Sequence, residues 1–89
     1  MELKLVEKGK DKVRVEFEGV DEALVNLFIA ELLKNEDVKE ANYTRKYMEE
    51  DAHVLYVSMS KGKPITAMKK AAENLSDEFK RAKKMLQKE

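Results

Sequence analysis

The 89-residue sequence contains no cysteine, one proline and a single histidine. The lack of cysteine excludes disulfides and thiolate chemistry, which fits a reducing compartment. Apolar runs fall far short of the roughly 18–20 residues that span a bilayer, and the charged residues 1–10 do not resemble a secretory signal. We therefore expect an unprocessed cytoplasmic protein with no membrane contact.

Net charge is also lacking, because 18 Lys and Arg residues balance 18 Asp and Glu residues. Without a global positive field, sequence-specific nucleic-acid binding by the chain alone is disfavoured. A chain of this length builds one modest core, so we expect a single domain over residues 1–89.

The shortage of histidine and cysteine also limits catalysis. Zinc needs three or four His, Cys or carboxylate ligands, and His53 is the only histidine, so we interpret it as a surface residue at a strand edge. The serines have no paired base, and the carboxylates are spread among basic residues. We expect no catalytic residues, no metal and no cofactor.

The strongest pattern lies in residues 63–88, where apolar residues recur at steps of three and four. This spacing predicts one stripe along a long helix, with Pro64 in its first turn. About 24 residues at about 1.5 Å each make a rod of about 36 Å, longer than a short strand. The end of the stripe should therefore overhang the domain and need a partner. The stripe comprises Ile65, Met68, Ala72, Leu75, Phe79, Ala82 and Leu86.

The remaining chain predicts four strands and one more helix. Alternating residues before and after a Glu7–Asp11 turn predict a hairpin, and Asp21 is a good N-cap for a helix over 21–35. Strands follow at 38–45, with a bulge allowed by its imperfect alternation, and at 53–60; the charged residues 46–51 are expected as a solvated loop or strand extension. The predicted fold is α+β in the order ββαββα, with two helices on one face of an antiparallel sheet.

The helix over 21–35 carries more apolar surface than one contact needs. Its apolar arc covers about 180°, whereas a helix lying on a sheet needs about 100°. We assign Leu24, Leu27 and Phe28 to the sheet, and a second group to a partner: Val25, Ile29 and Leu33. The alternative is that the last helix of the same chain covers the whole surplus.

Basic residues cluster at the two ends of the last helix. Lys61, Lys63, Lys69 and Lys70 lie near its start, and Lys80, Arg81, Lys83 and Lys84 near its end. We interpret them as a solvated face, with a phosphate contact inside a larger assembly as the alternative.

Residues 17–28, Phe-Glu-Gly-Val-Asp-Glu-Ala-Leu-Val-Asn-Leu-Phe, resemble the opening of the first helix in archaeal RNA polymerase subunit L. Gly19, Asp21, Leu24 and Asn26 match that family's pattern. Residues 62–65, Gly-Lys-Pro-Ile, resemble the opening of its last helix. The family is similar to the eukaryotic AC19-type subunit and to the dimerisation domain of the bacterial α subunit.

The resemblance implies a non-catalytic subunit of DNA-directed RNA polymerase that forms a heterodimer with the polymerase's α-like subunit. Together they would form the platform on which the large catalytic subunits assemble. We expect the isolated chain to self-associate or to be marginally stable. The alternative is a free-standing homodimeric regulator or RNA-binding module that uses its sheet face, where Tyr43, Tyr47 and Tyr56 could stack bases.

Overall fold

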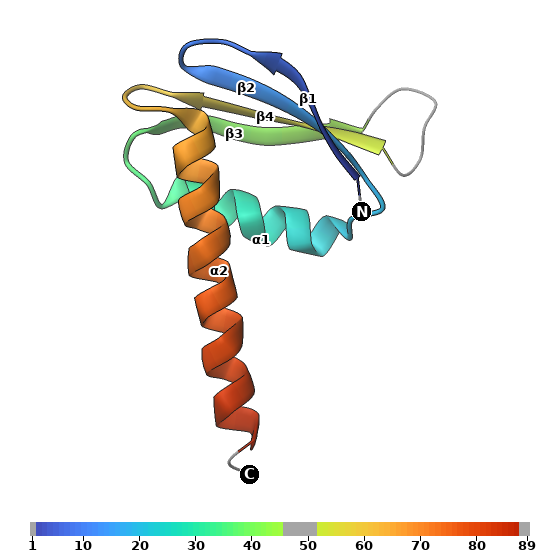
Figure 1. Ribbon diagram of the computed structural model, residues 1–89, viewed down its shortest axis with the longest axis vertical. Helices are drawn as coiled ribbons and strands as arrows, with labels where there is room; N and C mark the ends of the chain where they lie inside the picture. Colours follow the sequence, from blue (N-terminus) through green and yellow to red (C-terminus); the bar gives the residue numbers. More distant parts are fainter. Residues whose placement is uncertain (1, 46–51, 88–89) are drawn as a thin grey trace.

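The computed structural model describes residues 2–45 and 52–87, with the side chains of residues 2 and 3 excepted. The elements follow the order β1 (Glu2–Lys8), β2 (Lys12–Glu18), α1 (Glu22–Leu33), β3 (Val38–Arg45), β4 (Ala52–Met59) and α2 (Pro64–Gln87). The strands form one antiparallel sheet in the order β1-β2-β4-β3, and both helices lie on the same side of it (Figure 1). The predicted fold and element order are confirmed; residues 46–51 and Lys88 lie outside the described residues.

Alternation on the two central strands builds the core. Val13, Val15 and Phe17 of β2 are buried, and the register sets Val15 beside Leu55 of β4 and Val13 beside Val57. Because side chains on a strand alternate between faces, these residues all point toward the helices. The register shifts after Val38, where the sequence allowed a bulge, and also after Leu5, where no bulge was predicted.

Helix α1 begins and ends at recognisable signals. The carboxylate of Asp21 accepts a hydrogen bond from the Ala23 backbone N–H at 2.8 Å, which satisfies one free donor at the helix start. At the other end the Asn35 side chain accepts from the Asp37 N–H at 2.9 Å, which turns the chain into β3. The helix is shorter than the predicted range of 21–35.

Helix α2 is held to the sheet only by its first turns. Gly62 adopts a φ of 88° just before it, and Pro64, Ala67 and Ala71 are buried, small enough for a close approach to the sheet. Its second half extends away from the body (Figure 1), and Phe79 and Leu86 are 53% and 76% exposed. The predicted overhang is confirmed. Neither helix among the described residues is long and apolar enough to cross a membrane.

Candidate functional site: an open apolar groove

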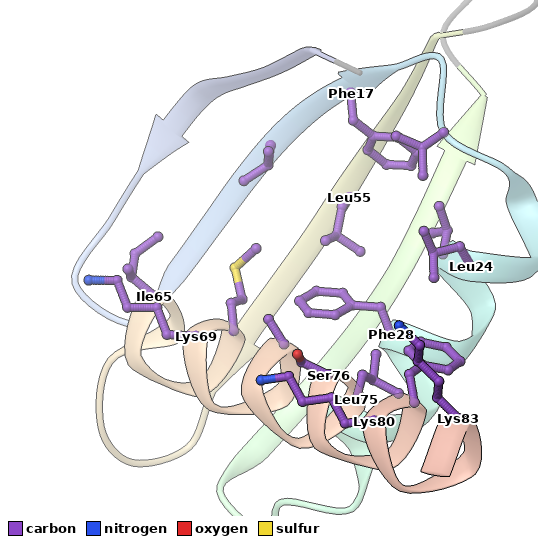
Figure 2. A pocket seen from close by; sticks show the side chains of 16 residues that line it. Phe17, Leu24, Phe28, Leu55, Ile65, Lys69, Leu75, Ser76, Lys80 and Lys83 are labelled. Carbon is purple, nitrogen blue, oxygen red and sulfur yellow. The ribbon is translucent and has the colours of Figure 1, made fainter. Parts of the chain in front are cut away.

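An apolar groove of about 770 Å³ lies between the inner face of the sheet and the two helices (Figure 2). Its floor comes from β2 and β4, and its two sides come from α1 and α2. The apolar residues that line it are Val15, Phe17, Val20, Leu24, Val25, Phe28, Leu55, Ile65, Met68, Ala72, Leu75 and Phe79.

The groove is open because the chain's own helices diverge over it. Leu24 on one side is 43% exposed, and Phe79 on the other is 53% exposed. Contiguous apolar surface of this kind on a soluble domain marks an interaction site. The arrangement offers burial of apolar surface to another chain, which is a binding function.

Much of the predicted α2 stripe meets in the groove. Met68, Ala72, Leu75 and Phe79 line it, although Met68 also packs against the core. The last two residues of the stripe, Ala82 and Leu86, lie beyond it on the exposed half of α2. Their contact with a partner stays a prediction.

The predicted orientation of α1 is wrong. Val25 is 6% exposed and belongs to the core together with Leu32, seven residues later, which is 1% exposed. Residues seven apart lie on one helix face, so these two fix the rotation of α1. Val25 thus faces the chain's own sheet, whereas Leu24 and Leu27, which we assigned to the sheet, are about half exposed.

The other two α1 residues assigned to a partner differ in their surroundings. Ile29 is half-buried and packs against the core, whereas Leu33 is 55% exposed but does not line the groove. The alternative that α2 covers the whole surplus of α1 is also wrong, since Leu33 joins Leu24 and Leu27 in being exposed.

His53 is buried, which corrects its interpretation as a surface residue. It is 4% exposed, its ring stacks on Phe17 at 5.3 Å, and Tyr43 meets it edge-on at 5.5 Å. Its Nε2 lies 3.1 Å from Oε1 of Glu22, in the first turn of α1. The alternation that places Leu55 on the inner face also places His53 there, so the signal was present in the sequence.

This histidine cluster ties α1 to the sheet. Glu22 also lies 3.6 Å from the Arg45 guanidinium, so one carboxylate links the helix start to β4 and β3. Across residues 2–45 and 52–87, no group of three or more His, Cys, Asp or Glu side chains could hold a metal ion.

Comparisons with known proteins identify the same architecture. The family described as the RNA polymerase Rpb3/Rpb11 dimerisation domain matches residues 12–85. DNA-directed RNA polymerase subunit Rpo11 of Thermoplasma acidophilum is 33% identical over 87 residues, which cover 98% of this chain and 78% of that protein. The Rpo11 subunit of Methanothrix thermoacetophila is 36% identical over 77 residues, covering 86% of this chain and 85% of that protein.

Similarity extends to a solved structure. The crystal structure of DNA-directed RNA polymerase subunit L from Thermoplasma acidophilum superposes with a TM-score of 0.88 at 32% sequence identity. The match covers 98% of this chain and 86% of that one.

Proposed function

The chain belongs to the RNA polymerase Rpb3/Rpb11 dimerisation-domain family, and on that premise we propose that it acts as a non-catalytic polymerase subunit in a heterodimer with the α-like RNA polymerase subunit. In this role the pair is the platform on which the large catalytic subunits assemble. The chain contributes binding surface and no reacting group, and it works in the cytoplasm with the rest of the transcription machinery.

The observation that carries the proposal is the open groove together with the exposed half of α2. Both are apolar and continuous along one helix, from Ile65 at the base of the groove to Leu86 near the helix end. A partner helix laid along this surface would remove it from water, and such burial contributes about 25 cal/mol for each Å² of apolar area before the costs of association.

We propose two sets of residues as the partner surface. The α2 set follows the sequence prediction and comprises Met68, Ala72, Leu75, Phe79, Ala82 and Leu86. On α1, Leu24 and Phe28 take the place of Val25, because they line the groove from the opposite side. Ile29 and Leu33 stay at the margin of this surface.

The alternative of a free-standing RNA-binding module finds no support in the aromatic residues. Tyr43 faces the helices, where it packs against Phe17 and His53. Tyr56, across from it in the alternation of the sheet, lies under the Arg14 guanidinium at 5.3 Å. The two tyrosines are therefore on different faces and do not form one stacking platform.

Copurification tests the proposal directly. The tagged chain, expressed in its native cells, is expected to recover the α-like subunit and the large polymerase subunits at moderate salt. Phe79→Asp should lose them, because a carboxylate would be buried without a counter-charge at the groove. Met85→Asp is the matched control, since Met85 is 72% exposed on the same helix and does not line the groove.

Circular dichroism of both variants checks that the strands and helices are retained. Recovery of the polymerase subunits by Phe79→Asp as efficiently as by Met85→Asp would contradict the proposed surface. Recovery of the unmodified chain by itself, without any polymerase subunit, would contradict the proposed function.

A further inference from the structure

The groove is apolar across its width but cationic along one edge. Among its lining residues the charged side chains are Lys69, Lys80 and Lys83, and the one other polar side chain is Ser76. All four belong to α2, and their spacing of 7, 4 and 3 residues places them on one strip of the helix beside the apolar stripe. Figure 2 shows these side chains along the α2 side of the groove. We call Lys69, Lys80 and Lys83 the lysine edge.

The charge of the lysine edge is not neutralised within the described part of the chain. None of the three ammonium groups forms an ion pair with a carboxylate of residues 2–45 or 52–87. Glu73 and Asp77 of α2 do not line the groove. They lie further round the helix, on the side away from the apolar stripe.

The opposite edge of the groove has no charge to match. It is formed by Val20, Leu24 and Phe28, and no Asp or Glu belongs to the groove lining. An occupant of the groove would therefore meet apolar surface on one flank and lysines on the other. The complementary ligand is an amphipathic helix with an apolar face and with Asp or Glu residues along one flank.

A second copy of this chain is poorly matched to the same surface. In a twofold-symmetric dimer the same patch serves both subunits, so both copies would bring a lysine edge and neither would bring a lining carboxylate. Like charges brought together at the rim of an interface disfavour that pairing.

We propose that the lysine edge selects the partner: it favours a helix with an acidic flank and disfavours self-association through the groove. The inference rests on the proposed function, because it assigns the chemistry that the α-like subunit must present to this groove. The apolar lining supplies the burial, and the lysine edge supplies the discrimination between a foreign helix and a second copy.

Electrostatic selection of this kind acts chiefly on the rate of association. Complementary charges raise association rates by about 10- to 1,000-fold at low salt, and the effect disappears as salt screens the charges. At 1 M salt the screening length is about 3 Å, shorter than the span of a lysine side chain.

The experiment compares two triple variants of the full chain with the same change in net charge. Lys69→Gln/Lys80→Gln/Lys83→Gln neutralises the lysine edge, while Lys70→Gln/Arg81→Gln/Lys84→Gln neutralises three exposed cations elsewhere on α2 that do not line the groove. Association with the purified α-like subunit is followed by stopped-flow at 20 mM and 1 M salt, and self-association by sedimentation equilibrium at 20 mM salt.

We expect the lysine-edge variant to associate with the α-like subunit about tenfold more slowly than the control variant at low salt, and at the same rate at 1 M salt. It should also self-associate more strongly than the control. Equal association rates for the two variants at low salt would overturn the inference and leave the proposed function intact.

Failure of the unmodified chain to bind the α-like subunit would instead refute the proposed function. Self-association would still test the lysine edge in that case. Equal dimerisation by the two variants overturns the inference, and stronger dimerisation by the lysine-edge variant supports its role against self-pairing.

Discussion

Phe79 separates the energy of partner binding from the energy of folding. The residue is 53% exposed in the isolated chain, and it lies on α2 beyond the turns that are buried against the sheet. A phenylalanine exposes about 200 Å² when fully accessible, so about 100 Å² of Phe79 is available to a partner. At about 25 cal/mol per Å² this area contributes about 2.5 kcal/mol, which corresponds to a roughly 70-fold change in dissociation constant.

Phe79→Ala should therefore weaken binding to the α-like subunit by up to about 70-fold while changing the unfolding free energy of the isolated chain little. Leu32→Ala provides the contrast, because Leu32 is 1% exposed in the core and does not line the groove. Its truncation should cost about 2–5 kcal/mol of unfolding free energy. Isothermal titration calorimetry measures the first quantity, and urea unfolding measures the second. The reasoning fails if Phe79→Ala destabilises the isolated chain as much as Leu32→Ala does, or if it leaves the dissociation constant unchanged.

Two further predictions concern the turns that position the helices. Asp21→Ala removes the acceptor of the Ala23 N–H and should lower the unfolding free energy by about 1 kcal/mol in urea, with Asp21→Asn retaining most of it; equal loss in both variants would exclude capping as the cause. Gly62→Ala should cost about 1–2 kcal/mol through its φ of 88° alone, because no atom lies within 4 Å of an added Cβ; an unchanged urea midpoint would disprove the strain.

Periodicity predicted the elements of this fold well, because each has a strong pattern and clear ends. The three- and four-residue steps from Ile65 onward could only be a helix, and the overhang followed from its length relative to a strand. The same stripe contained the residues of α2 that now line the groove. These predictions needed only local information.

The rotation of α1 could not be predicted in the same way. Its apolar arc is so wide that Leu24 and Val25, one residue apart, fit the sheet equally well by pattern. Only packing against the sheet, with Val25 and Leu32 on the same side, decides between them. The burial of His53 was missed because its chemical type was given more weight than its position in the alternation of β4.

The attachment of α2 at one end makes it a lever. Its first turns are clamped by Pro64, Ala67 and Ala71, while its tip has no support from the rest of the described chain. Because the rod is about 36 Å long, a rotation of about 5° at the clamp moves the tip by about 3 Å, the scale of one side-chain contact. The small alanines at the base therefore govern the angle at which this protein presents its far end. A bulkier residue there would misalign contacts tens of ångströms away without touching them.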